Sequence, residues 1–144
     1  MNQVKILLLS VFLISPSNVF ADYKSMLKKA EQGNAETQYA LGAMYQLGKG
    51  VSENDNEAFK WTRLAAIQGY AKAQNNLGYM YDMGEGVAQD DMRAYMWKYL
   101  AAEQGELDAA EHRDEIASQM SKQQLERGQK MASDCKARNY KSCD

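Results

Sequence analysis

Residues 35–70 and 71–106 repeat one another, and this repetition constrains the fold more than any other feature of the chain. When the two stretches are aligned without gaps, 17 of 36 positions carry the same amino acid. Average residue frequencies would give about two identities by chance. A period of this length is typical of a helix–turn–helix unit that stacks on its own copies. We therefore expect a chain built by stacking one local structure.

The first half of each copy has the pattern of an amphipathic helix that ends at a glycine. In the first copy, Ala35, Leu41, Met44 and Tyr45 recur at three- and four-residue steps. Gly48 stands where this helix should end, a common place for a left-handed glycine cap. A glycine inside a helix costs about 1 kcal/mol relative to alanine. The internal Gly42 therefore indicates close approach of a partner helix.

The second half of each copy predicts another helix. Asp55 and its equivalent Asp91 are placed to cap its first turn, because an aspartate oxygen accepts a bond from a free backbone amide. Its predicted buried stripe contains Ala58, Trp61, Leu64 and Ala65.

The residues that the two copies share resemble the Sel-one-like repeat, a relative of the tetratricopeptide repeat. In the first copy they are Ala35, Gln38, Leu41, Gly42, Met44, Tyr45, Gly48, Gly50, Val51, Asp55, Ala58, Trp61, Leu64, Ala65, Ala66, Gln68 and Gly69. The resemblance implies an all-α fold, an α/α solenoid with a right-handed superhelical bend. It also implies an adaptor or scaffold for protein–protein contacts.

The repeat frame extends beyond the two copies and divides the chain. We expect a repeat domain over 22–136, composed of a half repeat at 22–34, the full repeats 35–70 and 71–106, and a capping helix pair at 107–136. The half repeat is expected to be one second-type helix from Asp22 to Gln32. In the capping pair, Ser121 opens a Ser-x-x-Gln capping box and Asp114 replaces the helix glycine. The tail, 137–144, follows.

Both cysteines, Cys135 and Cys143, lie near the end of the chain. Two neighbouring cysteines in an oxidising compartment are expected to form a disulfide that ties down the tail. A metal site and a redox pair are the alternatives. Seven intervening residues and no partnering histidine make a poor zinc site, so the structural disulfide is favoured.

The N-terminus is typical of a secretory signal peptide, residues 1–21. Lys5 precedes an apolar run from Ile6 to Ile14, and small residues lead to a predicted cleavage after Ala21. The alternative is a membrane anchor, but the run is shorter than the roughly 20 residues that span a bilayer. We expect a periplasmic or secreted protein with no membrane span.

Composition and motifs argue against several functions. The formal net charge is −2, so the chain lacks the basic surface of a nucleic-acid-binding protein. The single histidine, His112, lies in a charged segment and is expected to be a solvated surface residue, with no nucleophile placed for a catalytic triad. We find no metal-binding or cofactor-binding motif and expect a protein that is not an enzyme.

Candidate binding residues are those that differ between the copies, because shared residues hold the stack together. Differing positions of the first helices lie three or four residues apart and so share one face. In tetratricopeptide-like folds this face lines the concave groove, although such positions can also be ordinary surface. The predicted partner-binding residues are Tyr39, Asn75, Asn76, Tyr79 and Asp82.

Three functions are compatible with these observations. The leading one is an exported adaptor or scaffold that binds a protein or peptide partner in the concave groove. The second is a protein that binds or modifies cell-wall fragments, which predicts a convergent polar pocket. The third is a structural or inhibitory subunit of an envelope complex. This last function predicts an exposed apolar patch, in which Leu47 and Met83 could take part.

Overall fold

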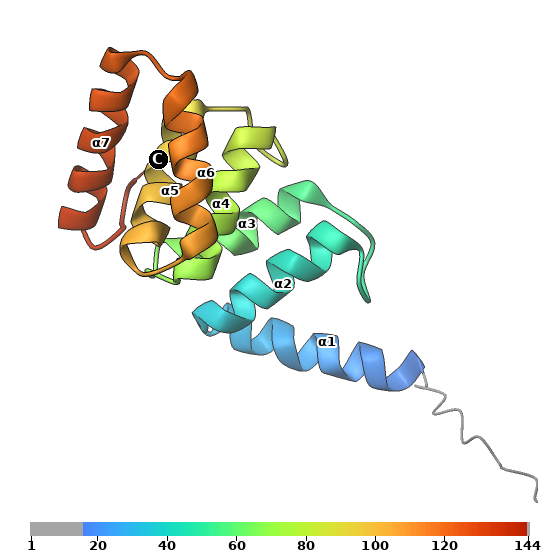
Figure 1. Ribbon diagram of the computed structural model, residues 1–144. Coiled ribbons are helices and arrows are strands. Elements are labelled where there is room, and N and C mark those ends of the chain that lie inside the picture. The colour runs from blue at the N-terminus through green and yellow to red at the C-terminus, as the bar shows by residue number, and fades with distance from the viewer. Residues whose placement is uncertain (1–15, 144) are drawn as a thin grey trace, which may run out of the picture.

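The computed structural model describes residues 16–143, with side chains from Phe20 onward. These residues form seven α-helices joined by short turns (Figure 1). The helices are α1 (Pro16–Glu31), α2 (Ala35–Leu47), α3 (Asp55–Ala66), α4 (Ala71–Met83), α5 (Asp91–Glu103), α6 (Leu107–Gln119) and α7 (Lys122–Ala137). Within this part of the chain there is no strand, which confirms the predicted all-α class.

Successive helices pack on one another, so the repeats form an α/α solenoid (Figure 1). The closest pairs are α2 with α3 and α4 with α5, the two helices of each full repeat. Helices α1, α3 and α5 each pack also on the next first helix, α2, α4 and α6. The predicted helix–turn–helix unit is therefore the unit of packing.

The predicted glycine caps are confirmed, but the predicted aspartate caps are wrong by one residue. Gly48 and Gly84 end α2 and α4 with φ angles of 62° and 72°, in the left-handed region. The N-caps of α3 and α5 are Asn54 and Asp90, whose side chains accept backbone N–H bonds. Asp55 and Asp91 instead occupy the first helical position, where their charge faces the positive end of the helix dipole.

Gly42 and Gly78 allow the two helices of each repeat to approach closely, as predicted. A Cβ atom at Gly42 would lie 2.5 Å from Thr62 Oγ1 on α3. At Gly78 it would lie 2.8 Å from Lys98 Cγ on α5. Each glycine thus makes room for the side chain that crosses it, and the identity of that side chain differs between the repeats.

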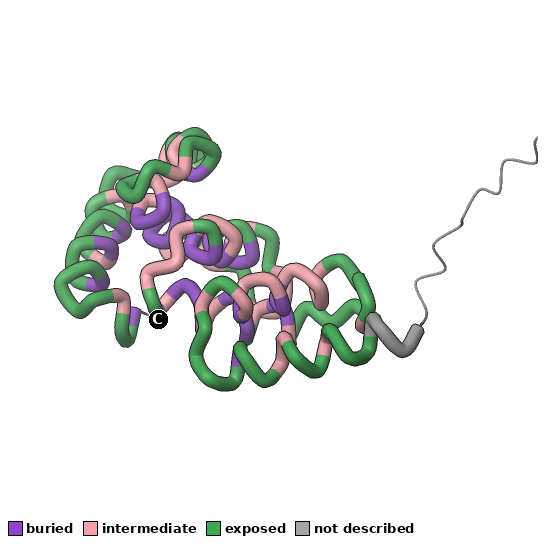
Figure 2. The backbone as a smooth tube through the Cα atoms, turned by 90° about the horizontal axis from the view of Figure 1, so that it is seen from below, coloured by how far each residue is buried: buried purple, intermediate pink, exposed green. Residues whose placement is uncertain are grey.

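The core is concentrated in the C-terminal part of the solenoid (Figure 2). A large buried cluster extends from α3 to the tail and is centred on residues such as Leu77, Trp97 and Leu100. A smaller cluster joins α1 to the first repeat through Ala30, Leu41 and Trp61. The N-terminal end therefore has fewer apolar contacts holding it than the end that carries α7.

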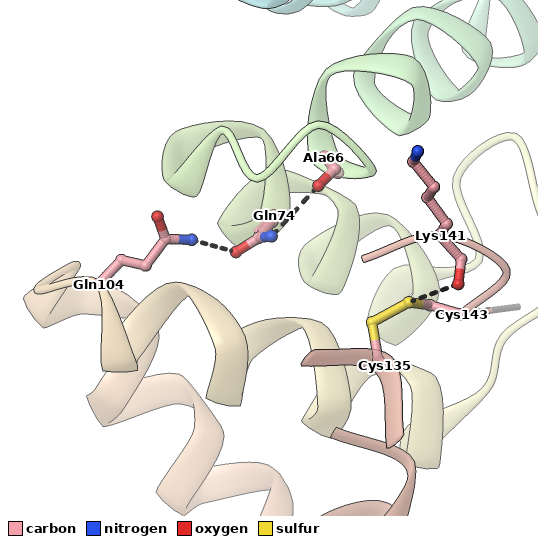
Figure 3. Close-up of a disulfide and its surroundings, with 6 residues drawn as sticks. All are labelled: Ala66, Gln74, Gln104, Cys135, Lys141 and Cys143. Carbon is pink, nitrogen blue, oxygen red and sulfur yellow. Dashed lines mark hydrogen bonds between the residues drawn. A yellow bond between two sulfur atoms is a disulfide. The ribbon is translucent and has the colours of Figure 1, made fainter. Parts of the chain in front are cut away.

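Buried glutamines link each turn of the solenoid to the next. Gln74 Nε2 donates to Ala66 O at 3.2 Å, and Gln104 Nε2 donates to Gln74 Oε1 at 2.7 Å (Figure 3). Gln38 and Gln68 make the equivalent bonds one repeat earlier. These bonds explain why the glutamines recur in both copies, since a buried amide without partners would cost roughly 1–3 kcal/mol.

The capping helices differ from a regular repeat. Helix α6 begins and ends as predicted, and Ser121 forms the predicted capping box with Gln124. Helix α7, however, packs mainly on α5. Asp114 replaces the glycine that would admit a second helix beside α6, whereas Gly128 brings α7 against Tyr95 of α5. The position of the glycine therefore redirects the last helix.

Cys135 and Cys143 form a disulfide, as the sequence predicts (Figure 3). It holds the tail against the body of the solenoid, where the Tyr140 ring covers Gly69 in the turn before α4. A disulfide that closes so short a loop stabilises the fold by about 2–3 kcal/mol at most. The covalent bond is compatible with an extracytoplasmic protein.

Helix α1 starts earlier than the expected half repeat. It begins at Pro16, so the predicted cleavage point between Ala21 and Asp22 lies inside it. The apolar segment of the predicted signal peptide, Ile6 to Ile14, lies outside the described residues. None of the helices in residues 16–143 has the length and apolar character needed to cross a membrane.

Candidate functional site

Four of the five predicted binding residues line one groove. Tyr39 of α2 and three residues of α4, Asn75, Asn76 and Tyr79, border a cavity of about 440 Å³. The other residues that line it are Lys72, Lys98, Glu106, Asp108 and His112. The groove therefore uses first helices from three successive units, α2, α4 and α6, with α5 beneath them.

Asp82 lies outside this groove. It borders a smaller neighbouring cavity of about 140 Å³, which His112 also lines. The spacing of Asp82 along α4 places it one turn beyond Tyr79. The predicted set is thus divided between two adjoining cavities, with His112 between them.

Lys98 of α5 is the central charged group of the groove and is absent from the predicted set. Its side chain is only 3% exposed. Its Nζ donates to Asn75 Oδ1 at 2.7 Å and lies 3.4 Å from His112 Nδ1. Burial lowers the pKa of Lys98 to about 8, although the charges of Asp82 and Asp108 act in the opposite direction.

The fold places Lys98 there through the repeat itself. Lys98 occupies the position that Thr62 holds in the first copy, facing the internal glycine of the paired helix. Its aliphatic stem crosses Gly78, so the ammonium group emerges beside Asn75. The pair Thr62/Lys98 was a detectable signal, since a lysine replaces a small residue on a buried face. Only the first helices were compared, so this signal was missed.

His112 is an exposed residue, but it is also part of the groove. It contacts Lys98 and lines both cavities. Its position in α6 is equivalent to Asn76 in α4, so the capping unit supplies a third copy of the variable face. The prediction of a simple solvated residue is therefore incomplete.

A chain of hydrogen bonds orients the polar side chains at one edge of the groove. Asn76 Nδ2 donates to Gln46 Oε1 at 3.1 Å, and Gln46 Nε2 donates to Glu85 Oε2 at 3.0 Å. The charge of Glu85, together with burial and a hydrogen bond to the same carboxylate, raises the pKa of Tyr79. This edge is thus held by bonds between side chains of both repeats.

At the other edge, the Tyr39 ring packs against the Tyr70 ring with centroids 5.5 Å apart. The groove therefore combines aromatic surface, amide groups and one buried cation. Aromatic rings supply contact area, and amides can bond a peptide backbone.

A second, more apolar cavity of about 670 Å³ lies at the N-terminal end of the solenoid. Phe20, Tyr23, Tyr45 and Val51 are among the residues that line it. Phe20 precedes the predicted cleavage point, so the wall of this cavity would change on maturation. The groove around Lys98 is lined by none of residues 1–21.

Comparison with known proteins places the repeats in a family. The Sel1 repeat model matches residues 35–70 and 71–106. Among solved structures, the chain is similar to c5321, a protective antigen of uropathogenic Escherichia coli strains that displays an SLR fold. The TM-score is 0.81 and the identity 27%, over 89% of this chain and 28% of the antigen.

The chain is also similar to a Sel1 repeat protein from Oxalobacter formigenes. The TM-score is 0.60 and the identity 42%, over 63% of this chain and 37% of that protein. The chain therefore spans well under half the length of either structure. No curated protein matches it. Sel1 repeat proteins generally mediate protein–protein interaction. Because the matched repeats cover half of its length, the chain belongs to the Sel1 repeat family.

Proposed function

We propose that this protein is an exported adaptor without catalytic activity, and that it binds an extended segment of a partner protein in the groove around Lys98. The observation that carries the proposal is the meeting of Tyr39, Asn75, Asn76 and Tyr79 around one cavity. Aromatic rings and side-chain amides around one cavity are groups that can bind an extended peptide. The predicted signal peptide and the disulfide support export.

The groove is short, which limits the expected affinity. A cavity of about 440 Å³ accommodates a few residues of a bound segment rather than a folded domain. Most of the binding energy is then expected to come from a few contacts near its centre. Asn75 and Tyr79 are the most informative residues to change, because both line the groove and neither belongs to the buried core.

The test is crosslinking and affinity capture from extracts of the source cells. We expect the unmodified protein to capture one partner. The Asn75→Ala, Tyr79→Ala variant should capture at least about tenfold less of this partner, which corresponds to a loss of about 1.4 kcal/mol in binding free energy. The matched control is Lys122→Ala, Glu126→Ala, which changes two exposed residues of α7. Equal capture by both variants would place the binding surface elsewhere.

The second candidate is a binder of cell-wall fragments. It is favoured by the convergence of Lys98, Asn75 and His112, which is the type of polar pocket that this function predicts. Retention of the protein on purified insoluble cell wall, lost in the same groove variant, would favour this function over the adaptor.

A further inference from the structure

We propose that Lys98 is the receptor for a carboxylate group of the bound segment, supplied by an acidic side chain or by a free C-terminus. This inference rests on the proposed function and deepens it by naming the chemistry that is recognised. It makes Lys98, and not the aromatic rings, the group that selects one segment over another.

The first argument is that Lys98 is a buried cation without an ion-pair partner. Its side chain is 3% exposed, and within residues 20–143 no carboxylate forms a salt bridge with it. Its two close contacts are Asn75 Oδ1 and His112 Nδ1, and neither belongs to a carboxylate. Buried charges in proteins are normally paired, because removing an ion from water is costly. A carboxylate of the ligand would supply this pairing.

The second argument concerns the hydrogen-bond donors that face the groove. An ammonium group has three N–H donors, and two contacts of Lys98 are within the protein. Asn75 accepts from Lys98 through Oδ1, so its amide nitrogen is a further donor beside the same point. Two neighbouring donors, one of them charged, match the two oxygens of a carboxylate.

The third argument is the charge around the groove, which limits the negative charge that a bound ligand can carry. Lys72 lies at the same cavity, but so do the acidic residues Glu106 and Asp108. Asp82 adds a carboxylate from the neighbouring cavity. These acidic groups would repel a doubly charged phosphate more strongly than a carboxylate. The nearby charges on α4 and α6 therefore favour a weakly charged ligand held directly by Lys98.

The site is restricted to the second repeat. The equivalent position of the first repeat is Thr62, and that of the capping unit is Asp134, whose side chain binds Lys130 on the surface of α7. A bound segment therefore has one anchoring point for a carboxylate, which would fix its register in the groove.

The test uses three five-residue peptides, each with an acetylated N-terminus and with alanine at every position except the central one. The first has a central asparagine and an amidated end and carries no carboxylate. The second has a central aspartate and an amidated end, and the third has the asparagine and a free C-terminal carboxylate. Binding is measured by nuclear magnetic resonance, from the shifts of the Asn75 and Asn76 side-chain amides in the protein purified from the periplasm of an expression host.

We expect one or both of the carboxylate peptides to bind at least about tenfold more tightly than the neutral peptide. The stronger of the two identifies the source of the carboxylate. The Lys98→Met variant keeps the stem over Gly78 and should lose the preference. The control Lys122→Met removes an exposed lysine of α7, outside the groove, and should retain the preference. The preference should also decline above pH 8, as the Lys98 ammonium loses its proton.

Equal binding of the three peptides, a preference that survives Lys98→Met, or no shift with any peptide at millimolar concentration would overturn the assignment of Lys98. Equal binding together with intact partner capture would leave the adaptor function standing and refute only the carboxylate receptor. Failure of the unmodified protein to capture any partner, or equal capture by the unmodified protein and the Asn75→Ala, Tyr79→Ala variant, would instead refute the adaptor function in this groove.

Discussion

Substituting Gly86 with alanine is expected to destabilise the fold by about 3–4 kcal/mol, a large part of the total stability of a small domain. Two effects add. Gly86 has a φ of 68°, and a left-handed conformation costs an alanine roughly 1–2 kcal/mol. A Cβ atom there would also lie 2.2 Å from the backbone oxygen of Asp55, and overpacking costs about 1–3 kcal/mol.

The control for this prediction is Gly105→Ala. Gly105 has a φ of 98°, but a Cβ atom there would meet nothing within 4 Å. Only the conformational cost of about 1–2 kcal/mol applies. Urea unfolding of both variants measures the difference. Similar losses in the two would show that the turn after α4 does not pack against the start of α3.

Replacing Lys98 with methionine is expected to stabilise the protein by about 2–3 kcal/mol at pH 7. The pKa of Lys98 is lowered from 10.5 to about 8 in the fold, mainly by burial. One pKa unit corresponds to 1.36 kcal/mol, so keeping the Lys98 ammonium charged in the folded protein costs about 3 kcal/mol. Loss of the bond to Asn75 offsets part of the gain.

The sign of the pH dependence distinguishes this cause from better packing. Below pH 8 Lys98 is protonated in both the native and the unfolded state, so the native state bears the full cost of burying the charge. Between pH 8 and 10.5 the native lysine loses its proton while the unfolded one keeps it, and the stability of the unmodified protein rises. The advantage of Lys98→Met should therefore shrink to about 1 kcal/mol or less near pH 10.

Urea unfolding at pH 7 and at pH 10 measures this change, and Lys72→Met is the control for an exposed lysine of the same groove. The free energy of unfolding of the Lys72→Met variant should stay within about 0.5 kcal/mol of that of the unmodified protein at both pH values. A Lys98→Met variant that is destabilised at pH 7 would show that the buried charge serves the fold. A stabilised variant supports a functional role, because residues kept at a cost to stability are typical of binding sites.

The repeat made most of the fold predictable. Glycines in the left-handed conformation end helices for a reason that is local to the chain, so α2, α4 and α6 were placed correctly from Gly48, Gly84 and the period. The N-cap residues of α3 and α5 were harder to predict, because Asn54-Asp55 and Asp90-Asp91 each offer two adjacent candidates. Local sequence does not decide which of the two has extended backbone.

The site was only partly predictable. Comparing the first helices predicted Tyr39, Asn75, Asn76 and Tyr79, which line one groove, since variation on one helical face depends on spacing alone. The replacement of Thr62 by Lys98 in the second copy is visible in the sequence, but the burial of Lys98 depends on Gly78 of another helix, a tertiary contact that periodicity does not reveal. The path of α7 was missed for the same reason, since it depends on the contact between Gly128 and Tyr95.

The most direct test of the groove is photo-crosslinking in the source cells. A benzoylphenylalanine residue is placed at Tyr79, inside the groove, or at Glu126, on the surface of α7. We expect the probe at position 79 to form an adduct with one partner protein, at a segment that contains an acidic residue or the C-terminus, and Lys98→Met to abolish it. The same adduct from both positions, or adducts from position 126 alone, would contradict the assignment of this groove as the binding site.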